Sequence, residues 1–162
     1  MTIEVPFAQF RTVVEPEWVD HNGHMGIRSY TLVFDRAVTR FYGELNLTRD
    51  QLKPHGGSIF ALQETAWFKR EVMLDDPLLV ASQLVDHDHN KFVTFHTLRQ
   101  TRDDYVAAMY EIIEIHIDMA TRKPTPFPDN IARHLAGVQR AHRELGRPPL
   151  SGMGIAIPRK KG

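Results

Sequence analysis

One long amphipathic helix, followed by a run of strands, is the feature that most constrains how this chain can fold. Apolar residues recur at spacings of three and four between residues 27 and 45, which places them on one helix face. They are Ile27, Tyr30, Phe34, Ala37, Val38, Phe41 and Leu45. Asn22 and Gly23 are typical of a helix entry, and Gly43 is typical of a helix end. A helix with one apolar stripe of this length needs a large apolar surface to pack against.

Strands are predicted on both sides of this helix, because segments rich in β-branched and aromatic residues alternate with turn residues. The expected strands cover residues 5–14, 58–71, 77–86, 91–100 and 105–119. Strands joined by tight turns pair antiparallel, so we expect the last four to be consecutive antiparallel neighbours. Glu111 lies on the apolar face of the last strand, and the sequence does not explain it. A second helix is expected from about Asp129 to Leu145, ending at Gly146.

The predicted fold class is therefore α+β, with an antiparallel sheet wrapped around one long central helix and an extra C-terminal helix, which is the layout of the hotdog fold. The length of 162 residues favours one compact domain. No internal repeat or linker divides the chain. We predict a single domain over residues 1–146 and a Gly- and Pro-rich tail over residues 147–162.

The composition excludes several functional classes. The chain has no cysteine, which excludes thiol nucleophiles, thiolate metal sites and disulfides. Its 20 Lys and Arg residues balance its 20 Asp and Glu residues, so we expect neither a nucleic acid nor a membrane as partner. We find no signal-like segment and no membrane-spanning apolar run, and we expect a cytoplasmic protein. The His pairs lack further ligands at metal-site spacing, so no metal site is predicted.

Residues 17–25, the run Glu-Trp-Val-Asp-His-Asn-Gly-His-Met, together with Tyr30 and the run at 34–37, resemble the 4-hydroxybenzoyl-CoA thioesterase-like family. Members carry an Asp ahead of a Gly-containing turn that opens the central helix. Later segments are similar to the betainyl-CoA thioesterase branch, which acts in carnitine breakdown; they lie at residues 57–64, 84–88, 95–97, 116–122 and 154–158. That branch has Asn where this chain has Gly26, and many relatives have His where it has Ile27. The resemblance implies an acyl-CoA substrate, a homodimer or homotetramer, and no cofactor, since CoA enters as part of the substrate.

Thioester hydrolysis requires an activated water or a protein nucleophile, and donors that stabilise the oxyanion. Without a Cys, and without a Ser in a Gly-x-Ser-x-Gly elbow, a carboxylate is the natural candidate, and the resemblance implies Asp20. Asp20 could act as general base or as nucleophile, and the sequence leaves both open. The first helix amides, around Gly26, Ile27 and Arg28, have no intrahelical partner and could stabilise the oxyanion.

Other candidate site residues also have ordinary structural interpretations. Asn22 could orient Asp20 or the substrate, or simply form the turn or cap, and His24 could bond Asp20, line the pocket or be satisfied by the backbone. The candidate substrate pocket consists of Tyr30, Phe34, Glu64 and Trp67. Glu64 could equally be a solvated edge residue, and the aromatic rings could be core or, with Trp18, a cage for a quaternary ammonium group. Candidates for the CoA phosphates are Arg28, Lys69, Arg70, Lys91 and Arg99.

The leading hypothesis is hydrolysis of a small or medium acyl-CoA, with betainyl-CoA as the best single candidate. Two alternatives stay open. One is a hotdog hydratase or dehydratase that acts on an enoyl- or hydroxyacyl-CoA. The other is a non-catalytic module that binds acyl-CoA.

Overall fold

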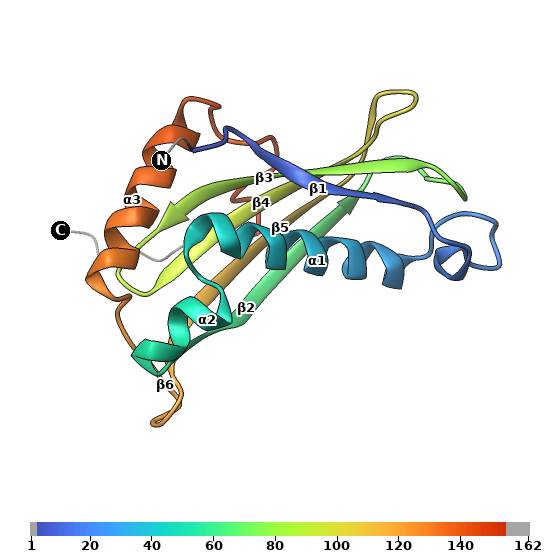
Figure 1. Ribbon diagram of the computed structural model, residues 1–162. Coiled ribbons are helices and arrows are strands. Elements are labelled where there is room, and N and C mark those ends of the chain that lie inside the picture. The colour runs from blue at the N-terminus through green and yellow to red at the C-terminus, as the bar shows by residue number, and fades with distance from the viewer. Residues whose placement is uncertain (1–2, 155–162) are drawn as a thin grey trace.

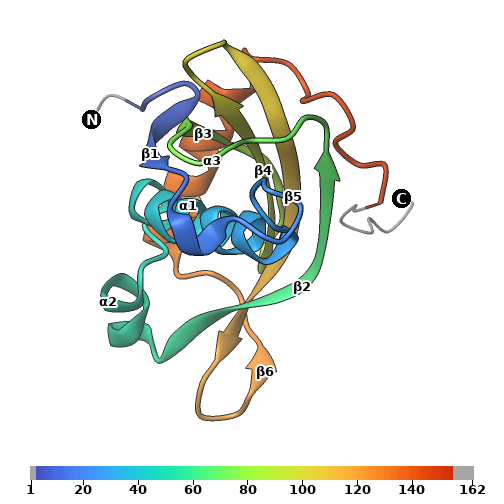
Figure 2. The same cartoon turned by 90° about the vertical axis from the view of Figure 1, so that its right-hand side faces the viewer.

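The computed structural model describes residues 3–154 and shows a strongly curled sheet around one long helix (Figure 1). The elements are β1 (Phe7–Val13), α1 (Ile27–Leu45), α2 (Arg49–Leu52), β2 (Gly57–Phe68), β3 (Pro77–His87), β4 (Lys91–Gln100), β5 (Tyr105–Asp118), β6 (Lys123–Pro124) and α3 (Asp129–Arg143). Short 3-10 turns at Pro16–Trp18 and Lys53–His55 complete them. Seen along the helix, the sheet curves around α1, which confirms the predicted architecture (Figure 2).

The strand order corrects one expectation from the sequence. The order is β1-β3-β4-β5-β2, every pair is antiparallel, and β6 adds to β5. β2 therefore pairs with β5, not with β3, its neighbour in sequence. The physical reason lies in residues 69–76, which form a crossing segment instead of a tight turn. Val72 in this segment is fully buried and its carbonyl accepts the amide of Met25, so the segment is held against the entry to α1.

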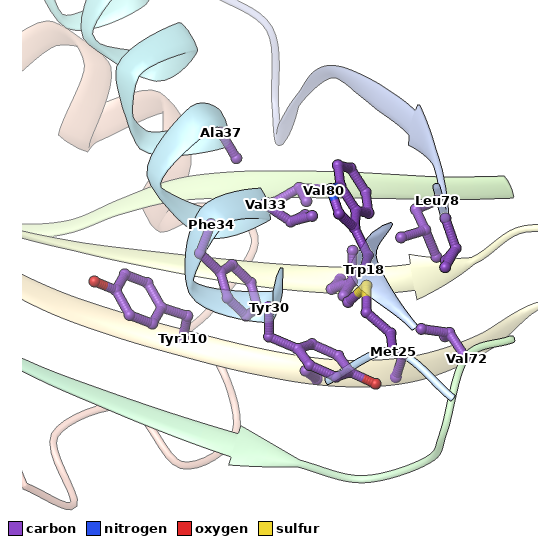
Figure 3. Close-up of a cluster of buried hydrophobic side chains, with 14 of the residues drawn as sticks. Trp18, Met25, Tyr30, Val33, Phe34, Ala37, Val72, Leu78, Val80 and Tyr110 are labelled. Carbon is purple, nitrogen blue, oxygen red and sulfur yellow. The ribbon is translucent and has the colours of Figure 1, made fainter. Parts of the chain in front are cut away.

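The first half of α1 packs on the sheet because its apolar stripe meets a mostly apolar concave face. Val33, Phe34 and Ala37 are buried against Val80 and Leu98. Figure 3 shows that Met25, Tyr30 and Val72 close this core where the helix begins. Within residues 3–154, no helix is long and apolar enough to cross a membrane.

The second half of α1 lies in a separate apolar cluster that α3 completes. Phe41 and Leu45 pack with Phe92 of β4 and with Ile131 and Leu135 of α3. A left-handed residue, Asn46, ends the helix, and its amide donates to the Tyr42 carbonyl. The C-terminal end of α1 is therefore both covered and satisfied in its hydrogen bonds.

Residues of the predicted C-terminal tail explain why Glu111 can lie on an apolar face of the sheet, which the sequence alone did not explain. Glu111 is fully buried on the face of the sheet that points away from α1. Its carboxylate accepts hydrogen bonds from the Ser151 hydroxyl at 2.5 Å and the Gly152 amide at 3.0 Å. Figure 2 shows this segment beside β5 and β2. Residues 155–162 of the predicted tail lie outside the described residues, and the domain boundary at residue 146 stays a prediction.

Candidate active site

A small hairpin delivers Asp20 to the start of α1. Val19 and Met25 form an antiparallel bridge, and the Asp20 amide donates to the His24 carbonyl at 3.0 Å. The turn closes because Gly23 adopts a positive φ of 82°, which glycine reaches without the strain that a side chain would add. The chain therefore doubles back within six residues and places position 20 next to position 26.

The Asp20 carboxylate has one occupied and one unoccupied oxygen. Oδ1 accepts the Asn22 amide at 2.8 Å, which is the turn-forming role expected of an Asp in this position. Oδ2 has no hydrogen-bond partner among residues 3–154. A Cβ at position 26 would lie 3.3 Å from Oδ2 and 3.2 Å from the Asp20 Cβ. A glycine at position 26 therefore avoids a steric clash with the Asp20 side chain. Asn22 thus positions Asp20 through its backbone amide.

Two backbone amides are unpaired at the start of α1. Gly26 is the N-cap, and no side chain caps the helix. The Gly26 amide donates to the Trp18 carbonyl at 2.8 Å, which removes it from the predicted set of oxyanion donors. The Ser29 amide turns back to the Gly26 carbonyl at 2.9 Å. Within the described chain, this leaves the Ile27 and Arg28 amides without an acceptor, at the positive end of the helix dipole.

A cavity of about 880 Å³ opens beside this helix end. His24, Ile27 and Tyr30 line one side, and residues 68–71, 73 and 74 line the other. Asp20 is not among the lining residues, but its carboxylate lies beside Gly26, the residue that precedes Ile27 in the cavity wall. The cavity therefore meets the helix at the residue whose amide is unpaired.

The His24 side chain lines the cavity and does not bond the Asp20 carboxylate. Its Nδ1 lies 3.2 Å from the Met25 carbonyl, which can only accept, so this nitrogen carries the proton. Its Nε2 lies 3.7 Å from Glu71 Oε1, another lining residue. The Nε2 nitrogen therefore lies at the cavity, next to a carboxylate.

The cationic candidates separate into two groups. Lys69 and Arg70 line the cavity, and the Arg70 guanidinium lies 3.9 Å from the ring centroid of Tyr105. Lys91 pairs with Asp88 and Arg99 pairs with Asp104, and neither lines the cavity. Arg28 is exposed but also lies outside the lining. Two of the five residues predicted to bind the CoA phosphates therefore line the cavity.

The predicted substrate pocket does not come together in this chain. Only Tyr30 lines the cavity, where burial raises its pKa to about 12. Phe34 stacks on Tyr110 in the core with centroids 4.9 Å apart. Glu64 accepts a 2.5 Å hydrogen bond from Tyr110, so it faces α1 although it remains exposed. Trp67 stacks on Phe95 on the opposite face of the sheet, because neighbouring residues of a strand point to opposite faces.

Sequence reasoning missed the far wall of the cavity. Met73, Leu74 and Tyr105 line it, and Arg102 adds a cation whose Nη1 lies 2.8 Å from Asp76 Oδ1. The available signal was the apolar run at residues 72–74, which is unusual for a turn. No group of three or more His, Asp or Glu side chains within residues 3–154 is placed to hold a metal ion.

Named relatives match the chain over nearly its full length. The betainyl-CoA thioesterase of Pseudomonas aeruginosa is 29% identical over 92% of this chain and 94% of that protein. The L-carnitine dehydrogenase/betainyl-CoA thioesterase of Ruegeria pomeroyi is 26% identical over 94% of this chain, which corresponds to 31% of that longer protein.

Solved structures agree with the fold. A hypothetical protein from Staphylococcus aureus, solved in complex with CoA, has a TM-score of 0.84 at 27% identity and covers 98% of this chain and 99% of its own. A 1,4-dihydroxy-2-naphthoyl-CoA thioesterase from Synechocystis has a TM-score of 0.69 at 17% identity, over 88% and 98% of the two chains. The hotdog fold is confirmed by these neighbours.

The family follows from a match that spans most of the chain. The model of the thioesterase-like superfamily matches residues 14–135, from the end of β1 into α3. This range contains the Asp20 turn, the start of α1 and the lining of the cavity. The chain therefore belongs to the thioesterase-like superfamily.

Proposed function

We propose that this protein hydrolyses acyl-CoA thioesters at the start of α1. The observation that carries the proposal is a carboxylate with an unpaired oxygen, Asp20, beside Gly26, followed by two unpaired amides at Ile27 and Arg28, of which Ile27 lines a large cavity. These groups meet the two requirements of thioester hydrolysis, activation of a nucleophile and stabilisation of an oxyanion. The named relatives are thioesterases, which supports the same reaction class.

In the proposed mechanism the thioester oxygen accepts hydrogen bonds from the Ile27 and Arg28 amides. Charge develops on that oxygen in the transition state, and one well-placed donor contributes about 3–4 kcal/mol. Asp20 acts either by taking a proton from the attacking water or by attacking the carbonyl carbon to give a mixed anhydride that water then hydrolyses. In both routes the C–S bond breaks and CoA leaves as the thiolate. We propose no cofactor and no metal for this step.

His24 and Asn22 support the reaction in different ways. The Asn22 amide holds Oδ1 of Asp20, so that Oδ2 is the oxygen available for chemistry. The Nε2 of His24 lies beside the cavity, where it can form a hydrogen bond with substrate or with the reacting water. We therefore assign His24 to substrate or water positioning.

The cavity suits the CoA part of the substrate. Its volume of about 880 Å³ lies within the usual range of ligand sites, about 300–1,000 Å³. Lys69 and Arg70 supply positive charge for the phosphates. The Staphylococcus aureus relative was solved with CoA, which supports the same class of ligand.

Betainyl-CoA is our best single candidate for the substrate. The Pseudomonas aeruginosa and Ruegeria pomeroyi relatives carry this activity in their names. Tyr30 and Phe68 line the cavity next to Ile27, with ring centroids 5.1 Å apart. Aromatic rings stabilise a quaternary ammonium group, so these two residues support a cationic acyl group.

We also propose that the protein acts in the cytoplasm as a homodimer or homotetramer. β2 is an edge strand of 12 residues, and Phe60, Leu62 and Phe68 are exposed on it. Proteins rarely leave such an edge bare, because its unpaired amides and carbonyls invite pairing. Light scattering that gives a monomer mass at micromolar concentration would contradict this assignment.

The test is a thioester panel with two matched variants. Wild-type protein should release CoA from betainyl-CoA faster than from short-chain or aromatic acyl-CoAs. Asp20→Asn should lower turnover by about 10²–10⁴-fold, the usual contribution of a positioned acid or base, with an unchanged melting temperature. The control is Glu17→Gln, which removes an exposed carboxylate three residues away and should leave turnover unchanged.

Three outcomes would count against the proposal. Turnover in Asp20→Asn equal to wild type would remove Asp20 from the mechanism. Absorbance that shows hydration of an enoyl-CoA, without release of CoA from any thioester, would favour the hydratase reaction instead. Tight CoA binding without turnover on the whole panel would leave only the binding module.

A further inference from the structure

Three carboxylates line the cavity beside α1, and they differ in how firmly they are partnered. Asp76 is buried and ion-paired, and Asp103 accepts a hydrogen bond from the Gln100 side-chain amide at 3.2 Å. The ion-pair partner of Glu71 in the described chain is His24, whose Nε2 lies 3.7 Å from Oε1, and the Glu71 side chain is 70% exposed. Glu71 therefore presents its carboxylate to whatever occupies the cavity.

Tyr105 holds Glu71 in place and keeps a neighbouring cation away from it. The Tyr105 hydroxyl donates to the Glu71 carbonyl at 2.7 Å, which fixes the backbone of that residue. The ring of the same tyrosine lies 3.9 Å from the Arg70 guanidinium, which keeps this cation over the ring face. No described Lys or Arg lies within ion-pair distance of Glu71. The cations that line the cavity thus leave this carboxylate without a direct partner.

Glu71 lies next to the part of the cavity where the acyl group would be bound. The Met25 amide donates to the Val72 carbonyl at 2.9 Å, so the segment that contains Glu71 lies against the entry to α1. Figure 3 shows Tyr30 at the same entry. Burial, with neighbouring groups that include the Glu71 carboxylate, raises the pKa of Tyr30 to about 12, so the carboxylate acts on the tyrosine hydroxyl.

The helix geometry connects this carboxylate to the proposed oxyanion donors. Ile27 and Tyr30 both line the cavity and lie three residues apart on α1. Residues at this spacing are neighbours on a helix surface, with about 5–6 Å between their Cβ atoms. An acyl group whose oxygen is bound at the Ile27 amide therefore reaches the space beside Tyr30 and Glu71.

We propose that Glu71 selects a positively charged acyl group in the cavity. This inference rests on the proposed function and names the residue that decides its substrate class. With the thioester oxygen at the Ile27 amide, a quaternary nitrogen two bonds from the carbonyl carbon reaches the space between Tyr30 and Glu71. The aromatic ring stabilises the methyl groups of such a cation, and the carboxylate supplies the opposite charge. A neutral acyl group of the same shape gains only the contact with the ring.

The test compares two unreactive acyl-CoA analogues of equal shape and different charge. Both are ketones in which a methylene group replaces the thioester sulfur; one carries the trimethylammonium group of betainyl-CoA, and the other carries the tert-butyl group of 3,3-dimethylbutanoyl-CoA. Titration calorimetry of the full-length protein should show about fivefold tighter binding of the cationic analogue, a modest ratio because the carboxylate is largely exposed. Glu71→Gln keeps the size of the side chain and should lower this ratio to less than about twofold. The wild-type ratio should also fall as the ionic strength is raised from about 0.1 M to about 1 M, because salt screens an exposed charge.

The control removes a carboxylate at a distant position. Glu144→Gln changes an exposed side chain at the end of α3, no residue of which lines the cavity, and should keep the wild-type ratio. Equal affinity of wild type for the two analogues would overturn the proposal. So would an unchanged ratio in Glu71→Gln, even with an equal loss of affinity for both analogues.

CoA release from the corresponding thioesters separates this failure from a failure of the proposed function. Release by wild type, together with an unchanged ratio in Glu71→Gln, would overturn only the role of Glu71. A ratio that depends on Glu71, without release of CoA from any thioester, would support the role of Glu71 and overturn the reaction.

Discussion

The two ends of α1 differ in almost every physical respect although they belong to one continuous helix. At the C-terminal end, Phe41 and Leu45 are buried between the sheet and α3, and Asn46 closes the last turn. At the N-terminal end no side chain caps the helix, and Ile27 is 66% exposed beside a cavity. The closed end carries stability, whereas the open end keeps polar groups unpaired and available for a ligand.

This difference shows how a small fold can separate stability from chemistry. The unpaired amides and the unpaired oxygen of the Asp20 carboxylate contribute little to the stability of the fold, because they have no hydrogen-bond partners in the described chain. Their presence is tolerated because the other half of the helix and α3 anchor the element. We expect mutations at the closed end to change the free energy of unfolding, and mutations at the open end to change turnover.

The largest contrast should come from truncating one apolar side chain at each end. Phe41→Ala removes a ring that is 1% exposed and packs 5.3 Å from Phe7, centroid to centroid. We expect a loss of about 3–5 kcal/mol in the free energy of unfolding. Ile27→Ala should change it by less than about 0.5 kcal/mol. Urea unfolding of both variants measures the contrast, and equal losses would contradict the difference between the two ends.

Burial at the closed end also disfavours a charged histidine side chain, so the free energy of unfolding should depend on pH. His96 lies edge-on to Phe41, and its ring nitrogens are 2.8 Å from the Ser82 and Thr94 hydroxyls. Burial lowers the His96 pKa to about 3, against about 6.5 in the unfolded chain. The unfolded state therefore takes up a proton first as the pH falls. Stability from His96 is complete above pH 6.5 and should decrease by about 1.4 kcal/mol per pH unit below it, until the folded pKa is reached.

Urea unfolding between pH 7.5 and 5 checks this slope by comparison of two histidine variants. His96→Gln should have a flatter dependence on pH than wild type. The exposed His55 lies outside the buried clusters, so His55→Gln should follow wild type. Parallel curves for all three proteins would show that His96 is not the residue responsible.

A smaller effect is expected where Gly26 meets Asp20 at the open end. Gly26→Ala places a methyl group 3.2 Å from the Asp20 Cβ, so the carboxylate must shift by a few tenths of an ångström. We expect turnover to fall by about tenfold, since catalytic groups tolerate little displacement, with a change in unfolding free energy below about 1 kcal/mol. The matched control is Gly43→Ala on the same helix, where the added methyl group meets nothing within 4 Å. It should keep full turnover and gain about 0.5–1 kcal/mol.

The sequence predicted the helices and strands better than it predicted which strands pair with each other. The stripe from Ile27 to Leu45 matched α1, and the strand at residues 91–100 was found with the same bounds, because local periodicity determines such elements. The pairing of β2 with β5 was missed, since it depends on how far the sheet curls. The short helix α2, held by a capping box between Thr48 and Gln51, was also missed.

The site was predictable where it depends on consecutive residues and not where it depends on tertiary contacts. The turn at residues 20–24 and the helix start could be placed together because they adjoin in sequence. The Gly26 amide was wrongly included among the free donors, because its acceptor, the Trp18 carbonyl, follows from the hairpin. Trp67 was assigned to the pocket, but the alternation of β2 turns it to the other face.

The most direct measurement is the response of backbone amides to an unreactive substrate analogue. A betainyl-CoA ketone, in which a methylene group replaces the thioester sulfur, keeps the carbonyl oxygen but cannot be hydrolysed. In amide NMR spectra of the saturated complex we expect the largest downfield proton shifts at Ile27 and Arg28, and little change at Gly26, whose amide already bonds Trp18. A saturated complex in which the Ile27 and Arg28 amides do not shift would contradict the assignment of the reaction to this helix end.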